Sequence, residues 1–351
     1  MTELGIQRSA MRLDPTTGDW VLFAPSRLLR PQEFRPHRPA ALREATPDRK
    51  CPFCPGAEQL TPPEVYREPP SNGSSEWLVR VVPNRFPALQ VEESPRRVTD
   101  GPGFERMGGC GAHEVIIESP VHSTPLALQP IDQIERVLRA ARSRYRDLMQ
   151  DQRMQAIVVF ENYGTNAGTT LSHPHWQVIA TAVVPPLLRL KHRIATEYFD
   201  RTGDCLYCAM TRRELDASER VVVANDAFAA VVPYASHIPF ELWILPQRHV
   251  PSFGDVADHE LRPLAEILRT SLQSLHACLE DPDYNMTIDS VARGDEHKAY
   301  FLWHIRVLPR LAPQSGFELG SGMSVNTVLP EEAAAYLRAS DLAAAAERAN
   351  R

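Results

Sequence analysis

The stretch FENYGTNAGTTLSHPHWQ, residues 160–177, joins the end of an apolar run to a glycine-bearing turn and the pattern His-Pro-His-x-Gln. The flanking runs AIVV (156–159) and VIATAVV (178–184) are typical of strands. Alternate side chains of a strand point to one face, so His173, His175 and Gln177 are expected on the same face. We therefore predict a strand–turn–strand unit whose second strand carries the chemistry.

The same order of parts occurs twice in the chain, which indicates an internal duplication. In the first half the parts are CPFC (51–54), NRFPAL (84–89), EVIIESPVH (114–122), an amphipathic helix after Pro130, AIVVFEN (156–162) and His173. In the second half they are CLYC (205–208), NDAFAAVVP (225–233), ELWILPQRH (241–249), a helix over 261–275, YNMTIDS (284–290) and His304. We place the domain boundary so that residues 1–190 form one domain and 191–351 the other.

Aligning the two halves on their last histidines pairs His304 with His173. Arg306 then falls where His175 stands, and Leu308 falls where Gln177 stands. This alignment predicts that the second half keeps a metal site but lacks a nucleophile.

Composition and charge exclude several classes of protein. The 351 residues carry a net charge of −6 and no block of basic residues, so nucleic acid is not the expected partner. No apolar run approaches the roughly 18 residues of a membrane span, and the N-terminus lacks the apolar core of a signal peptide. These features favour a cytoplasmic protein, where cysteines stay reduced and disulfides are rare.

Four of the six cysteines form two Cys-x-x-Cys pairs, and each pair is followed by two matching histidines. Zinc prefers four tetrahedral ligands of these types. We therefore predict two structural Zn²⁺ sites, the first formed by Cys51, Cys54, His122 and His173, and the second by Cys205, Cys208, His249 and His304.

Other interpretations of these residues stay open at the level of sequence. The Cys-x-x-Cys pairs could be redox-active, although no strand–helix–strand pattern surrounds them. One site could have lost its metal. His113 competes with His122 for the first site, and the repeat favours His122 because His113 aligns with Phe240.

His175 is the expected nucleophile. A neutral imidazole attacks phosphorus well and is also a good leaving group from the resulting phosphoramidate. A hydrogen bond from its Nδ1–H, for example to the carbonyl of His173, would direct Nε2 at the substrate. Gln177 would donate to a phosphoryl oxygen, and the turn at Gly168 and Thr170 offers backbone N–H groups and a hydroxyl to phosphates. The competing interpretation is that His-Pro-His only binds metal.

The chain resembles the galactose-1-phosphate uridylyltransferases of the histidine-triad superfamily. The motifs that carry this resemblance span nearly the whole length and are RLDPTTGDWVLFAPSRLLRP (12–31), CPFCPG (51–56), VPNRFPAL (82–89), HEVIIESPVHS (113–123), FENYGTNAGTTLSHPHWQ (160–177) and PEEAAAYLR (330–338). The resemblance implies an α/β (α+β) fold of duplicated histidine-triad-like halves, with a mainly antiparallel half-barrel sheet and flanking helices. It also implies a homodimer.

The resemblance further implies a ping-pong reaction through nucleotidyl-His175, with a nucleotide sugar and a sugar 1-phosphate as substrates. It assigns substrate contacts to residues of several motifs, namely Arg27, Arg30, Asn84, Phe86, Asn162, Thr170, Gln177, Phe317 and Glu318. The function it favours is UDP-glucose–hexose-1-phosphate uridylyltransferase, an enzyme of galactose metabolism.

Some residues depart from that pattern. Arg85 stands where an acidic residue is common, and Ser324 stands near the place of a hexose-binding Gln. GFELGSGMSVN (316–326) and the second Cys-x-x-Cys pair resemble the ADP-glucose phosphorylase branch instead. Adenylyl transfer from ADP-glucose is therefore the alternative. A dinucleotide hydrolase and a catalytically inert, zinc-stabilised nucleotide-binding protein are the other hypotheses.

Overall fold

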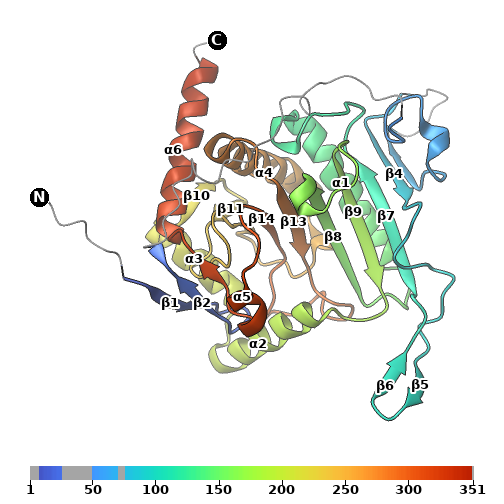
Figure 1. Ribbon diagram of the computed structural model, residues 1–351, viewed down its shortest axis with the longest axis horizontal. Helices are drawn as coiled ribbons and strands as arrows, with labels where there is room; N and C mark the ends of the chain where they lie inside the picture. Colours follow the sequence, from blue (N-terminus) through green and yellow to red (C-terminus); the bar gives the residue numbers. More distant parts are fainter. Residues whose placement is uncertain (1–7, 26–49, 70–75, 350–351) are drawn as a thin grey trace, which may run out of the picture.

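The computed structural model describes residues 8–25, 50–69 and 76–349. Within these residues, ten strands form one antiparallel sheet across the molecule (Figure 1). In spatial order they are β10 (Val221–Ala224), β11 (Phe228–Val231), β12 (Leu242–Pro246), β14 (His304–Pro309), β13 (Tyr284–Asp289), β8 (Ala156–Tyr163), β9 (His175–Thr181), β7 (Gly111–Ile117), β4 (Val79–Pro83) and β3 (Tyr66–Glu68).

The order of the strands makes the duplication visible. Read outward from the centre, one half runs β8-β9-β7-β4-β3 and the other runs β13-β14-β12-β11-β10. The halves join where β8 pairs with β13, with Tyr163 opposite Tyr284. Each half inserts one long helix before its central strand, α1 (Ile131–Leu148) before β8 and α4 (Asp258–Leu279) before β13. The expected α/β fold class with two similar halves and a mainly antiparallel sheet is confirmed.

Helices α1 and α4 cover one face of the sheet because their apolar residues recur at helical spacing. Ile134, Leu138 and Ala141 of α1 are buried against Trp176 and Val178 of β9 in one core cluster. In α4 the buried stripe consists of Leu261, Leu264, Leu268, Leu272 and Leu275. Each such side chain contributes about 1.5–3 kcal/mol on burial, so these contacts fix which face of β9 points inward.

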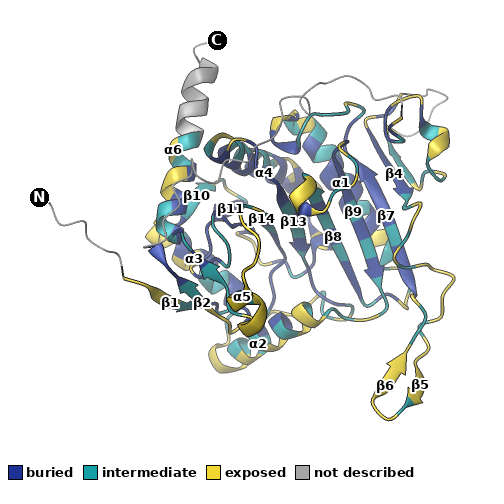
Figure 2. Cartoon of the chain, in the orientation of Figure 1, coloured by how far each residue is buried: buried dark blue, intermediate teal, exposed yellow. Residues whose placement is uncertain are grey.

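The opposite face of the sheet differs between the halves. In the second half, α2 (Pro186–Thr202) and α3 (Leu206–Ala217) cover it, and Ala195 and Tyr207 pack there against Trp243 and Leu302. In the first half, no helix of the described residues lies over β7, β8 and β9 on the side facing the viewer (Figure 1). Figure 2 shows half-buried residues along these strands. The first half therefore presents a partly exposed face that the second half lacks.

The remaining elements lie around the sheet. The N-terminal hairpin appears as β1 (Ala10–Leu13) and β2 (Trp20–Phe23), and β15 (Val325–Asn326) runs parallel to β2. The other described elements are the hairpin β5 (Val98–Gly101) and β6 (Phe104–Arg106), α5 (Gly316–Ser321), α6 (Pro330–Ala349), and the 3₁₀ turns η4 (Glu58–Leu60), η5 (Leu126–Leu128), η6 (Thr165–Ala167) and η7 (Phe253–Asp255).

The proposed boundary between residues 190 and 191 falls inside α2, and the sheet continues across it through β8 and β13. The two halves therefore share one sheet. Among the described helices, none is long and apolar enough to cross a membrane.

Candidate active site and metal centres

His175 begins β9 and points away from the helices. Trp176 is fully buried in the core with α1, so the alternating strand directs His175 and Gln177 to the opposite face. The Nδ1 atom of His175 lies 2.8 Å from the carbonyl oxygen of His173. A carbonyl only accepts hydrogen bonds, so Nδ1 carries the proton and Nε2 keeps its lone pair. Burial lowers the pKa of His175 below its usual value, which favours the neutral form.

Residues from the preceding turn and strand surround His175. The β8–β9 register pairs Glu161 with Trp176, and its continuation brings Asn162 opposite His175. The turn from β8 to β9 bends at Gly164 and Gly168, both with positive φ, which glycine adopts without strain. Gly168 and Thr170 are exposed, and the Phe53 ring meets the His175 imidazole edge-on with centroids 5.3 Å apart.

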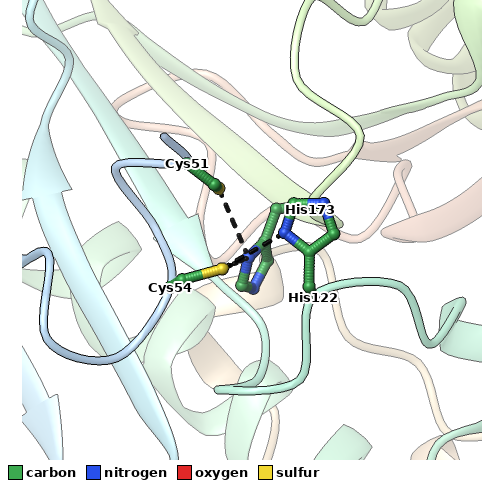
Figure 3. Close-up of side chains that lie close together, drawn as sticks. All are labelled: Cys51, Cys54, His122 and His173. Carbon is green, nitrogen blue, oxygen red and sulfur yellow. Dashed lines mark hydrogen bonds between the residues drawn. The ribbon is translucent and has the colours of Figure 1, made fainter. Parts of the chain in front are cut away.

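Four sulfur and nitrogen donors converge in one cluster (Figure 3), and one of them belongs to His173, two residues before His175. They belong to Cys51, Cys54, His122 and His173, and their ligand atoms all lie within 4.8 Å of one another. The Sγ atom of Cys54 is 3.2 Å from Nδ1 of His122 and 3.7 Å from Nδ1 of His173. Tetrahedral zinc with ordinary Zn–S and Zn–N bonds separates sulfur from nitrogen by about 3.6 Å, so the donor set fits zinc.

In this first cluster, the hydrogen bonds made by the second ring nitrogen of each histidine suit metal binding. The Nε2–H of His173 donates to the Ser119 carbonyl at 2.8 Å, which leaves Nδ1 free as a ligand. The Nε2 atom of His122 contacts the Ser172 hydroxyl at 3.1 Å. Such second contacts fix the tautomer and ring orientation of a metal-binding histidine. His113, the competing candidate, lies elsewhere, beside Gln177.

The second cluster contains three of its four predicted ligands. Cys205, Cys208 and His249 have ligand atoms within 4.8 Å of one another, and Cys208 Sγ is 3.2 Å from His249 Nδ1. Cys205 is buried, whereas Cys208 is half-buried and His249 is exposed. The prediction that His304 completes this site is wrong for this structure, since His304 is not part of the cluster.

The misplaced ligand reflects a two-residue shift in the predicted alignment of the halves. His304 begins β14 as His175 begins β9, and its Nδ1 lies 3.0 Å from the carbonyl of Leu302, two residues earlier. His304 is therefore the counterpart of His175, and Leu302 is the counterpart of His173. A leucine has no donor atom, so the second cluster has only three protein ligands among the described residues.

His304 occupies the strand position that corresponds to His175, but different groups surround its ring. Its ring stacks on Trp243 at 4.8 Å, lies 5.0 Å from the Tyr207 ring, and is completely buried. Its Nε2 is 3.5 Å from a carboxylate oxygen of Asp289, which also pairs with buried Lys191 at 2.5 Å. The covering helices α2 and α3 therefore turn this position into part of a buried charge network.

The other predicted substrate residues are distributed unevenly. Arg27 and Arg30 lie outside the described residues. The Asn84 carboxamide oxygen accepts from the backbone N–H of Phe86 at 2.9 Å; Asn84 is half-buried, whereas Phe86 is 83% exposed. Asn162 accepts from the Asn285 amide at 2.7 Å.

Phe317 and Glu318 lie in α5. Phe317 is half exposed. The Glu318 carboxylate accepts from the backbone N–H groups of Ser315 and Val325, so it caps the helix and holds β15. In Figure 1, α5, which carries these two residues, is drawn apart from β9, the strand that begins with His175.

Two groups near the site were not predicted from the sequence. His113 contacts Gln177, with Nε2 2.8 Å from the carboxamide oxygen. On the core face, the carboxyl groups of Glu118 and Glu161 are buried and interact with each other, and Tyr284 donates to Glu161 at 3.1 Å. An acidic residue inside each apolar run was the available signal, but only the order of the strands, with β9 between β8 and β7, brings the two together.

Comparison with known proteins covers almost the whole chain. The family model described as galactose-1-phosphate uridyl transferase, N-terminal domain, matches residues 2–185, and the model of the C-terminal domain matches residues 191–347. An ADP-glucose phosphorylase of Arabidopsis thaliana is 34% identical over 339 residues, covering 95% of this chain and 93% of that protein. A galactose-1-phosphate uridylyltransferase of Thermotoga maritima is 26% identical, covering 95% and 98%.

Solved structures agree with these matches. An ADP-glucose phosphorylase from Arabidopsis thaliana with bound ADP-glucose superposes with a TM-score of 0.80 and 32% identity, covering 95% of this chain and 98% of that one. A uridylyltransferase structure gives a TM-score of 0.74 and 27% identity, covering 96% and 99%.

The fold and these similarities define an enzyme of the nucleotidyltransferase class. The chain belongs to the galactose-1-phosphate uridylyltransferase family, whose two domain models follow one another along it.

Proposed function

We propose that this enzyme is an ADP-glucose phosphorylase, which transfers an adenylyl group from ADP-glucose to His175 and then to inorganic phosphate. The observation that carries this proposal is the 34% identity to the Arabidopsis ADP-glucose phosphorylase, against 26% to the Thermotoga uridylyltransferase over the same share of the chain. The sequence motifs favoured uridylyl transfer over adenylyl transfer, and these identities reverse that preference. Uridylyl transfer between UDP-glucose and hexose 1-phosphate is the second candidate.

A hydrogen bond at the expected sugar-binding segment supports the first candidate. Ser324 stands near the place of a hexose-binding Gln, and its hydroxyl is 3.0 Å from Nδ1 of His237. The other nitrogen of His237 pairs with Asp14 at 3.0 Å. Ser324 thus helps to fasten β15 to the N-terminal hairpin, and its side chain is shorter than the glutamine it replaces. The segment therefore departs from the uridylyltransferase pattern, which favours the first candidate.

The proposed reaction has two displacements at one phosphorus atom. The Nε2 lone pair of His175 attacks the α-phosphorus of ADP-glucose, the bond to the bridging oxygen breaks, and glucose 1-phosphate leaves with the electron pair. A phosphate oxygen then attacks the adenylyl phosphorus, the N–P bond breaks, and ADP leaves. The electron pair returns to Nε2.

The surrounding residues support both steps. The Nδ1–H bond to the His173 carbonyl orients the ring and stabilises the positive charge that the adduct places on it. The Gln177 amide, the Thr170 hydroxyl and the Gly168 backbone N–H would donate to phosphoryl oxygens.

Zinc is the metal that the donor sets favour, and its role would be structural. Cys51, Cys54, His122 and His173 would hold one ion with no open position, which contributes folding energy and fixes the segment before His175. Cys205, Cys208 and His249 would hold a second ion through three protein ligands.

A homodimer remains a prediction, to be checked by light scattering on a sizing column. Because α5 is drawn apart from β9 in Figure 1, Phe317 and Glu318 are expected to contact a substrate at His175 from a second copy of the chain. If the active enzyme is a monomer, Phe317 and Glu318 are not part of the site.

The test of the proposed function is the intact mass of the protein after incubation with ADP-glucose or UDP-glucose, without acceptor. We expect an adenylyl-sized gain that disappears in His175→Ala and when phosphate is added. A uridylyl-sized gain instead would transfer the proposal to the second candidate. Absence of any adduct would contradict both and favour a hydrolase or an inert binder.

A further inference from the structure

His113 lies on β7 next to the strand that carries the nucleophile. In the antiparallel β7–β9 register, Val115 is opposite Gln177 and His113 is opposite Ile179, so His113 and Gln177 are diagonal neighbours on one face. The Nε2 atom of His113 lies 2.8 Å from the carboxamide oxygen of Gln177. That face is the one to which His175 also points.

The position of the proton on His113 follows from its other neighbour. The backbone N–H of Ala88 donates to Nδ1 at 3.2 Å, so Nδ1 must be the unprotonated nitrogen. A neutral imidazole carries its single proton on the other nitrogen, which is Nε2. Nε2–H therefore donates to Gln177.

Asn84 does not alter this assignment. Its Nδ2 atom lies 3.1 Å from the same Nε2, but its carboxamide oxygen is already held by the Phe86 N–H at 2.9 Å. If Nε2 accepted from Asn84, the ring would have no proton at all, since Nδ1 also accepts. Gln177 is thus the group to which His113 donates, and the Asn84 amide contacts the ring without bonding to it.

We propose that His113 is a positioning residue, which holds the carboxamide oxygen of Gln177 so that the Gln177 amide N–H groups face the phosphoryl group on His175. An unrestrained glutamine amide can present either its oxygen or its nitrogen, and an oxygen facing a phosphoryl oxygen would repel it. The Nε2–H of His113 removes that alternative. This inference rests on the proposed function, because it assigns Gln177 to the transferred group.

His113 also joins Gln177 of β9 to the segment that carries Asn84. The carbonyl of His113 accepts from the Asn84 backbone N–H at 2.8 Å, while Nδ1 accepts from Ala88. Segment 84–88 is thereby fastened at both ends to the residue that orients Gln177. Loss of the ring would therefore release Gln177 and one end of this segment together.

The experiment measures the rate of adenylyl-His175 formation from ADP-glucose by quenched-flow mass spectrometry. His113→Phe keeps a ring but removes both nitrogens, and we expect the limiting rate to fall at least tenfold, in line with the loss of an aligned donor. The ADP-glucose concentration at half-maximal rate should change by less. His113→Gln places an amide N–H near the former Nε2 and should recover most of the rate.

A double-mutant cycle separates positioning from a merely structural role. In a Gln177→Ala background, His113→Phe should slow the reaction little further, because the group it orients is already absent. Independent, multiplicative losses in the two single variants would overturn the proposal, as would an unchanged rate in His113→Phe. An absence of adduct in the wild-type enzyme would instead refute the proposed function and this role with it.

Discussion

The buried carboxyl pair behind His175 makes the stability of the enzyme depend on pH. Burial raises the pKa of Glu161 to about 8 from its ordinary value of 4.5, and burial together with Glu161 raises the pKa of Glu118. A group whose pKa is higher in the folded than in the unfolded state stabilises the folded protein below its unfolded-state pKa. This stabilisation is lost as the pH rises through the folded-state pKa. The free energy of unfolding should therefore fall between pH 4.5 and 8.

Glu161→Gln isolates one of these two groups. The substitution keeps the shape of the side chain, keeps an oxygen for the Tyr284 hydroxyl and provides an amide donor for Glu118. One pKa unit corresponds to about 1.4 kcal/mol, so the three units from pH 5 to 8 amount to about 4 kcal/mol. The variant should match the wild type near pH 5 and exceed it by about this amount at pH 8.

The assay is urea unfolding at pH 5, 6, 7 and 8, extrapolated to zero denaturant. Glu105→Gln is the matched control, because Glu105 is exposed on β6, and it should leave the pH profile unchanged. Parallel profiles for Glu161→Gln and the wild type would refute the reasoning, since they would mean that Glu161 is ionised in the folded enzyme throughout.

Three further outcomes follow from the site and its surroundings. His175→Ala should abolish adduct formation in the mass assay while metal content and melting temperature stay unchanged; loss of a metal would mean that His175 is a ligand. A chelator should remove the metal of the three-ligand cluster first, measured by metal analysis over time; Cys208→Ser should lose that metal and Leu302→His should slow its release. Burial lowers the pKa of His237, but the hydrogen bond to Asp14 and the charges of Glu241, Asp14 and Asp19 together outweigh it, so the pKa is raised. His237→Gln should therefore lose more stability at pH 6 than at pH 9 in urea unfolding, and equal losses would contradict this linkage.

Much of the fold could be predicted because helix and strand periodicities differ. The helix expected after Pro130 is α1, and the runs at 156–162 and 284–290 are β8 and β13. The tautomer of His175 was also predictable, because the distance from a strand histidine to the carbonyl two residues earlier is local geometry. Such local features need no knowledge of which strands pair.

The position of His304 shows where sequence patterns fail. Strand side chains alternate with a period of two, so an alignment shifted by two residues keeps every side chain on the correct face. Pairing His304 with His173 or with His175 therefore gives the same pattern of buried and exposed residues. Only the start of β14 and the contact with the Leu302 carbonyl distinguish the two alignments. His113 was missed for a related reason, because its role depends on cross-strand pairing.

The two histidines at equivalent strand starts also explain why one half carries the proposed chemistry. Each ring has its Nδ1 beside the carbonyl two residues earlier, so the local geometry is shared. The difference is in what covers the ring. Over His304, α3 supplies Tyr207 and α2 supplies Lys191, which forms an ion pair with Asp289. A phosphorylated substrate could reach His304 only by displacing two helices, whereas the face around His175 ends in exposed turn residues. Retention of a nucleophile therefore depends less on the histidine itself than on leaving its face of the sheet uncovered.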